Sequence, residues 1–134
     1  MSIFDNSDVI FSYSRADAIE DGELVDVTER ASEEKAFFGG FSVPVAMTRA
    51  LYETLRNIPE SLKESQDLRG RAHDVLFLSA IALRRAKEHQ KHDANFSVVV
   101  ATEKDPQARL DLYIIAASGD DGEPVVTIGY PEDF

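Results

Sequence analysis

The stretch that decides the fold is NFSVVVATEKDPQARLDLYIIAASGDDGEPVVTIGY, residues 95–130. It contains three runs rich in β-branched and aromatic residues, which are typical of strands. Asp105 and Pro106 mark the turn between the first two runs, and the glycines and aspartates of residues 118–123 mark the second turn. Three consecutive strands with short connections predict an antiparallel meander at the C-terminal end of the chain.

The residues ahead of this meander predict helices. The longest helical pattern covers residues 69–91, where apolar side chains recur on one broad face. A second amphipathic pattern covers residues 46–58, and residues 14–22 predict a short helix with Ser14 as its N-cap and Gly22 as the left-handed residue after its end. We therefore predict an α+β fold, in which several helices, including one long central helix, pack on a small antiparallel sheet with a C-terminal three-stranded meander.

The composition narrows the class of protein. The 134 residues hold no internal repeat and no linker, so we expect residues 1–134 to form a single domain. Cysteine is absent, which excludes disulfides, thiol catalysis and cysteine-bound zinc. No apolar run has membrane-spanning length, and the N-terminal segment is acidic where a signal peptide is basic. We expect a cytoplasmic protein that makes no contact with a membrane.

The net charge of −11 is distributed unevenly along the chain. Residues 1–34 hold ten acids and two bases, a net of −8, whereas residues 35–92 hold ten bases and six acids, a net of +4. The last seventeen residues, 118–134, hold five acids and no base, a net of −5. This pattern disfavours direct nucleic-acid binding, which needs positive charge on one face, and favours docking onto a basic surface of another protein.

The acidic segments supply the candidate partner-binding residues. A first patch is expected from Asp17, Glu20, Asp21, Glu23 and Asp26, and a second from Asp120, Asp121 and Glu123. Aromatic side chains dominate the energetics of interfaces, so Phe37 and Phe38, beside two glycines, are the candidate apolar contacts. The basic C-terminal end of the long helix could pair with the acidic segment of a second copy, which leaves a homodimer open.

The acidic loop at residues 118–123 has a second interpretation as a site for a hard cation. It lacks the spaced acids of an EF-hand, and its glycines suit a hairpin turn, so the turn is favoured. We assign no metal and no cofactor.

An enzyme of undetermined class is the alternative to a binding protein. Tyr13 and Arg15, ahead of a short helix, are similar to the opening of ADP-ribosyltransferase-like domains, and His73 could join them. A hydrolase triad can also be drawn from His73, Asp74 and a serine, either Ser14 or Ser79, but no Gly-x-Ser-x-Gly motif is present. We therefore assign no catalytic residue and favour a non-enzymatic protein.

Several segments in one order resemble a known family. They are YSRADAIEDGELVDVTERA (13–31), GGFSVPVAMTRALYE (39–53), GRAHDVLFL (70–78) and GDDGEPVVTIGYPED (119–133). Together they resemble a small domain family of unknown function carried by bacterial plasmids, phages and other mobile elements. The family typically has an aromatic residue, usually Trp, where this chain has His73.

The resemblance implies an accessory protein that acts on host machinery. We expect an acidic protein that binds a host or element-encoded protein and modulates or inhibits it by covering its surface. Defence complexes such as CRISPR or restriction systems are the targets that the resemblance implies.

Overall fold

A computed structural model describes residues 13–33 and 41–134. Phe37 and Phe38, the predicted apolar contacts, lie outside the described residues. In chain order the elements are α2 (Arg15–Glu20), β1 (Leu24–Asp26), α3 (Thr28–Glu33), β2 (Val45–Thr48), α5 (Arg49–Arg56), η1 (Glu60–Leu62), α6 (Leu68–Glu88), β3 (Asp93–Val99), β4 (Arg109–Ser118), β5 (Pro124–Gly129) and η2 (Pro131–Asp133).

The strands form one five-stranded sheet in the order β1-β2-β5-β4-β3. The predicted meander is confirmed, because β3 pairs antiparallel with β4 and β4 pairs antiparallel with β5. At the other end β1 pairs antiparallel with β2, whereas β2 and β5 run parallel. The sheet is therefore mixed, and the prediction of a purely antiparallel sheet missed this one parallel pair.

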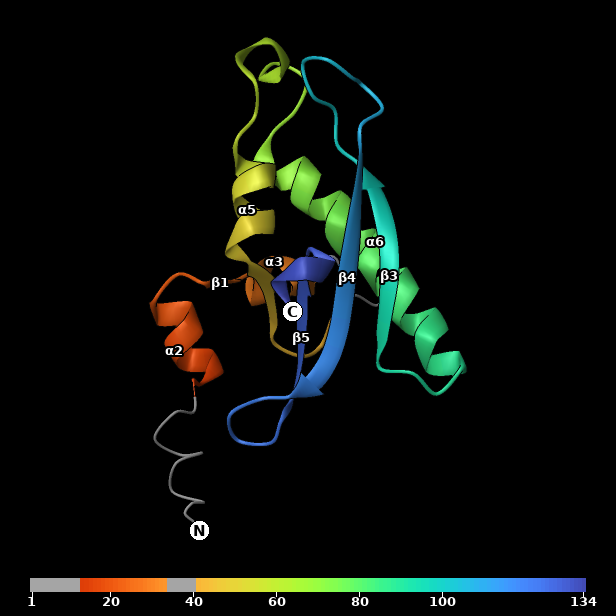
Figure 1. Ribbon diagram of the computed structural model, residues 1–134. Coiled ribbons are helices and arrows are strands. Elements are labelled where there is room, and N and C mark those ends of the chain that lie inside the picture. The colour runs from red at the N-terminus through yellow and green to blue at the C-terminus, as the bar shows by residue number, and fades with distance from the viewer. Residues whose placement is uncertain (1–12, 34–40) are drawn as a thin grey trace.

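The hydrophobic core lies between the sheet and the long helix α6, with α5 and α3 beside it (Figure 1). Alternate residues of the central strands point into it, among them Ile114 of β4 and Ile128 of β5, both fully buried. Leu76 and Leu83 of α6 meet them from the helix side. This arrangement of helices on one face of a small sheet confirms the α+β class.

The predicted helix over residues 46–58 is wrong in its first part. Val45–Thr48 forms β2, a strand with all four residues buried, and helix α5 begins only at Arg49. The Thr48 hydroxyl accepts a hydrogen bond from Leu51 N (3.4 Å), so this residue ends the strand and caps the helix. A strand buried between two neighbours has a continuous apolar pattern, which periodicity does not separate from a helix.

The long helix was predicted almost correctly, since α6 spans Leu68–Glu88 where residues 69–91 were expected. It ends early because Gln90 adopts a positive φ of 61°. Within residues 13–33 and 41–134, no helix combines the length and the apolar character that a membrane crossing requires.

Candidate functional site

Helix α2 displays part of the first predicted acidic patch. Its predicted N-cap is confirmed, because Ser14 Oγ accepts a hydrogen bond from Asp17 N at 2.9 Å. Gly22, with φ of 81°, occupies the left-handed position after the helix, as predicted. Ala18 is buried, whereas Asp17 and Glu20 are exposed. The helix thus buries a small residue and turns its carboxylates to water.

The acidic loop is a hairpin turn between β4 and β5, as favoured from the sequence. Gly119 N donates to Glu123 O (2.6 Å), and Gly122 N donates to Gly119 O (3.0 Å). Gly122 has a φ of 81°, a conformation that glycine adopts without strain. Asp121 N donates to the Glu123 carboxylate (3.0 Å). Across the described parts of the chain, no three His, Asp or Glu side chains are grouped so that they could hold a metal ion.

Asp120 of this turn holds the start of α2. Its two carboxylate oxygens accept hydrogen bonds from Arg15 N (2.8 Å) and Ala16 N (3.0 Å). These amides lie in the first turn of the helix, where backbone N–H groups lack partners within the helix. The two backbone hydrogen bonds, with a smaller contribution from the Arg15 charge, lower the pKa of Asp120. The two acidic segments that the sequence places about a hundred residues apart therefore touch.

Arg15 lies where the two segments meet. Its guanidinium donates to Thr127 Oγ1 (2.7 Å) and to the Val126 carbonyl (2.8 Å) on β5. Partial burial lowers the pKa of Arg15, while the charges of Asp26, Asp120 and Glu123 act in the opposite direction. The arginine is thus fixed on the sheet and shares its positive charge among carboxylates of both segments.

Asp26, at the end of β1, is held by hydrogen bonds from the start of α3. Its carboxylate accepts hydrogen bonds from Thr28 Oγ1 (2.5 Å) and Thr28 N (2.9 Å) at the start of α3. The side-chain hydrogen bond with Thr28 is the main reason that the pKa of Asp26 is lowered. Asp26 therefore stays ionised in the neutral pH range.

The remaining carboxylates differ in whether another side chain forms a hydrogen bond or an ion pair with them. Asp21 accepts a hydrogen bond from the Tyr13 hydroxyl (2.8 Å), which raises the pKa of that tyrosine to about 12. Glu23 forms an ion pair with Arg49 (2.6 Å), in which both side chains are more than half exposed. Asp17, Glu20 and Asp121 are exposed and form no ion pair with another described residue.

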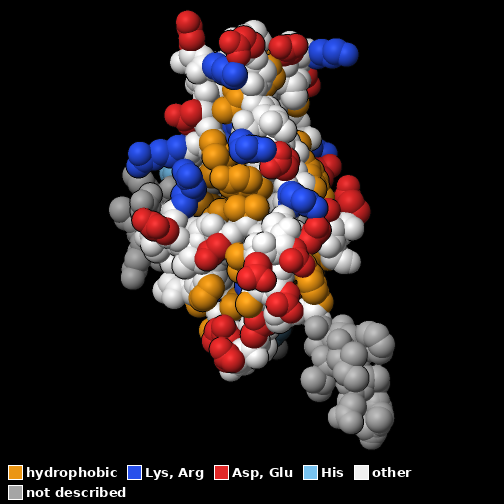
Figure 2. Space-filling model, turned by 90° about the vertical axis from the view of Figure 1, so that its left-hand side faces the viewer, with side chains coloured by type: hydrophobic (Ala, Val, Ile, Leu, Met, Phe, Trp, Pro, Cys, Tyr) orange, Lys and Arg blue, Asp and Glu red, His pale blue; other side chains and the backbone are white. Residues whose placement is uncertain are grey.

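We call these eight carboxylates, contributed by α2, the α2–β1 connection, β1 and the β4–β5 turn, the acidic surface: Asp17, Glu20, Asp21, Glu23, Asp26, Asp120, Asp121 and Glu123. Figure 2 faces the α2 side of the molecule and shows Asp and Glu side chains over its lower half, where Lys and Arg are scarce, and both kinds of charge over its upper half. The predicted acidic residues thus lie on elements that adjoin one another, because Asp120 of the β4–β5 turn contacts the start of α2.

A hollow of about 650 Å³ adjoins the acidic surface between α2, β1 and α5. Tyr13 and Leu24 provide its apolar lining, and Tyr13 is 57% exposed. Glu23, Glu53 and Asp133 bring three carboxylates to the same walls, and Arg49 brings a guanidinium that pairs with Glu23. An aromatic ring beside several carboxylates has the chemistry that a guanidinium or ammonium group prefers.

The residues proposed for an enzyme do not share a site. Tyr13 lines the hollow beside α2, whereas His73 and Asp74 line a different one at the start of α6. Ser79 is fully buried, and its hydroxyl donates to the Leu76 carbonyl (2.9 Å). A nucleophile, a base and an orienting acid within hydrogen-bond reach are therefore not assembled from these residues.

Sequence reasoning missed a groove between α6 and β3. Two apolar residues of α6 line it, Leu78 and Ile81. From the sequence they were assigned to the broad apolar face of the long helix, which was expected to pack in the core. The position of β3 at the sheet edge depends on the order of the strands, so no pattern local to α6 signals the groove.

The fold and the site define a small α+β domain with a concentrated acidic surface. The chain belongs to DUF6573, a family of unknown function whose model matches residues 1–134. Searches of curated proteins and of solved structures found no match.

Proposed function

We propose that this protein binds a basic surface of another protein through its acidic surface and blocks that surface. The observation that carries the proposal is the contact of Asp120 with Arg15 and Ala16, which joins the two acidic segments. Separate patches of three to five carboxylates are common on protein surfaces. A joined group of eight, three of which act on the partly buried Arg15, gives a stronger local field.

The acidic surface determines which side chains a partner presents to it, namely lysine and arginine. Asp17, Glu20 and Asp121 have no ion pair with another described residue, so an approaching lysine or arginine does not need to displace an internal partner. The hollow beside Tyr13 adds an exposed aromatic ring next to these carboxylates, although Arg49 of the chain itself lines the hollow and pairs with Glu23. On the partner's side, arginine suits a surface of carboxylates with a ring at its edge better than lysine, because its planar guanidinium stacks on rings and pairs with carboxylates.

The negative charge of the acidic surface favours targets that bind nucleic acid. Surfaces that bind nucleic acid are basic, and a protein that covers one with carboxylates competes with the phosphate backbone. We propose that the chain is an accessory protein of a mobile element and that its target is a host or element-encoded nucleic-acid-binding protein, of the kind found in CRISPR and restriction complexes. It acts by occlusion and needs no catalytic residue.

Affinity capture from a host lysate tests the proposal. The first bait is the natural chain, and the second carries Asp17→Asn, Glu20→Gln and Asp121→Asn, which remove charge without removing an ion pair among the described residues. A matched control carries Glu64→Gln, Glu103→Gln and Asp105→Asn, three exposed acids outside the acidic surface. Each capture is repeated with heparin as a competing polyanion.

We expect the natural chain and the control to retain the same partners at low salt. Heparin should release those partners, since it competes for the same basic surface, and the variant with the neutralised acidic surface should not retain them. Retention of the same partners by that variant would show that the acidic surface is not the binding site.

A further inference from the structure

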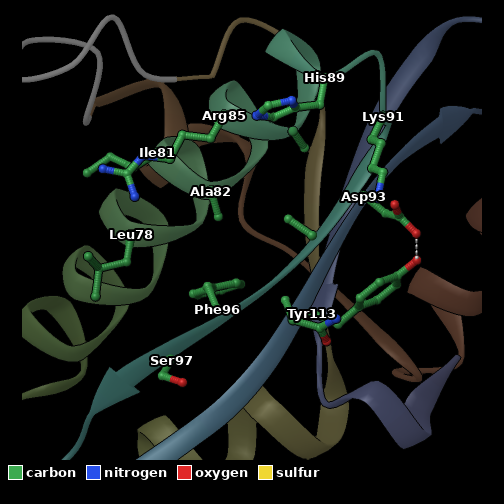
Figure 3. Close-up of a pocket in the computed structure, with 13 residues that line it drawn as sticks. Leu78, Ile81, Ala82, Arg85, His89, Lys91, Asp93, Phe96, Ser97 and Tyr113 are labelled. Carbon is green, nitrogen blue, oxygen red and sulfur yellow. Dashed lines mark hydrogen bonds between the residues drawn. The ribbon is translucent and has the colours of Figure 1, made fainter.

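A groove of about 610 Å³ runs between α6 and β3. Its apolar part comes from Leu78, Ile81 and Ala82 of α6 and from Phe96 of β3. Figure 3 shows Phe96 between the helix and the strand, with Arg85 further along α6 toward its C-terminal end. The groove lies on the opposite side of the molecule from α2 (Figure 1), so it is separate from the acidic surface.

Strand β3 is the last strand of the sheet, and one of its edges pairs with no strand in the described part of the chain. Val100 N donates to Ala108 O and Ala116 N donates to His92 O, both at 2.8 Å, so the even-numbered residues turn their backbone groups toward β4. The odd-numbered residues therefore present their N–H and C=O groups to the free edge. These residues are Asp93, Asn95, Ser97 and Val99.

This edge lacks the usual protection against pairing. Edge strands are commonly guarded by lysine, proline or a bulge, and the sequence DANFSVV contains neither residue. The register of β3 with β4 is continuous from Asp93 to Val99, so the strand has no bulge. The single charged side chain, Asp93, accepts a hydrogen bond from Tyr113 Oη at 2.5 Å. Seven residues are therefore available for strand addition.

We propose that β3 pairs antiparallel with β3 of a second copy around a two-fold axis, which joins the two five-stranded sheets. A register centred on Phe96 places Asn95 opposite Ser97 of the second copy and Asp93 opposite Val99. All four belong to the set whose backbone groups face the free edge, so the hydrogen-bonding pattern of an antiparallel pair is satisfied. The same register uses every residue of the strand.

A stripe of α6 with exposed ends and a half-buried middle is self-complementary about a centre of its own. Asp74, Leu78, Ile81 and Arg85 follow at intervals of four, three and four residues, so they share one helix face. In an antiparallel arrangement, Asp74 lies opposite Arg85 of the second copy and Leu78 lies opposite Ile81. Asp74 and Arg85 are exposed, and neither forms an ion pair with another described residue.

The two centres lie at the same groove. The midpoint of the helix stripe falls between Leu78 and Ile81, and these residues line the groove together with Phe96, on which the strand register is centred. A single two-fold axis at this groove therefore pairs the free backbone groups of β3, brings Leu78 against Ile81 of the second copy twice, and forms two ion pairs. This agreement favours a second copy over an unrelated extended peptide, which would have no reason to match the helix stripe.

Sedimentation velocity of the full chain over a range of concentrations tests the dimer. We expect a species of twice the 14.9 kDa of one chain, in equilibrium with the monomer. Asp74→Arg and Arg85→Asp, each alone, place like charges opposite each other and should raise the dissociation constant about tenfold. The double variant restores opposite charges at both contacts and should return the constant close to that of the natural chain.

A second variant tests the strand edge without changing a charge. Asn95→Pro removes an N–H group that faces the free edge and leaves the hydrogen bonds between β3 and β4 in place. It should abolish the dimer, while circular dichroism shows the secondary structure of the natural chain. A natural chain that remains monomeric at every concentration overturns the proposal, as does a double charge variant no tighter than the single ones.

Discussion

Asp120 accepts a hydrogen bond from Arg15 N at 2.8 Å, although 105 positions separate the two residues in the sequence. The β4–β5 turn thereby caps α2, a helix of six residues that is too short to be stable alone. The contact joins the two parts of the acidic surface and, with the Arg15 guanidinium on β5, holds α2 in position.

Removal of this cap should release α2. Asp120→Ala leaves Arg15 N and Ala16 N without their side-chain acceptor, and we expect hydrogen exchange of amides in α2 to accelerate several-fold. Asp121→Ala is the matched control, because it removes a neighbouring carboxylate that contacts no α2 amide. Equal acceleration in the two variants would show that the cap is not what holds the helix.

The same cap should weaken in acid. The pKa of Asp120 is lowered below its ordinary 3.8 by the backbone hydrogen bonds, so the folded state favours the ionised carboxylate. Its stabilising contribution is therefore complete above pH 3.8 and is lost as the pH falls below that value through the lowered pKa. Urea unfolding of the natural chain and of Asp120→Ala, compared from about pH 6 to about pH 2.5, measures the difference between them. That difference should shrink in acid; a constant difference contradicts the assignment.

The turn depends on Gly122, whose φ of 81° is unfavourable for residues with a side chain. Gly122→Ala should lower the free energy of unfolding by about 1–2 kcal/mol, the cost of a left-handed conformation. Gly122→Asn should lose less, since asparagine tolerates this region better. Urea titrations of both variants give the comparison, and equal losses would mean that φ is not the cause.

Arg71 stabilises the fold although it has no acidic partner among the described residues. It is 6% exposed and donates to Gln66 Oε1 (2.9 Å), Thr54 O (3.3 Å) and Ala101 O (2.8 Å). Arg71→Ala removes the donor to two partly buried carbonyls and should reduce the free energy of unfolding by about 1–3 kcal/mol. The exposed Arg69, changed to alanine, should change it far less, and a similar loss at both positions would refute this role.

Features fixed by neighbouring residues could be predicted from the sequence. The Ser14 cap, the left-handed Gly22 and the long helix follow from local patterns, and the meander follows from its two short turns. The acidic loop was correctly favoured as a turn for the same reason.

Features fixed by distant pairing could not be predicted. Strand β2 was taken for the start of a helix, because its neighbours β1 and β5 are far away in the sequence and bury it on both sides. The contact of Asp120 with α2 and the free edge of β3 likewise depend on the order of the strands. The acidic residues were named from composition, but only the fold places them on elements that adjoin one another.

The salt dependence of binding to a captured partner tests the central claim most directly. The dissociation constant is measured over a series of salt concentrations for the natural chain and for the variant with Asp17→Asn, Glu20→Gln and Asp121→Asn. Binding of the natural chain should weaken steeply as salt rises, because mobile ions screen the exposed carboxylates. The variant should bind more weakly at low salt and respond less to added salt. Equal affinities and equal salt slopes for the two proteins would contradict binding through the acidic surface.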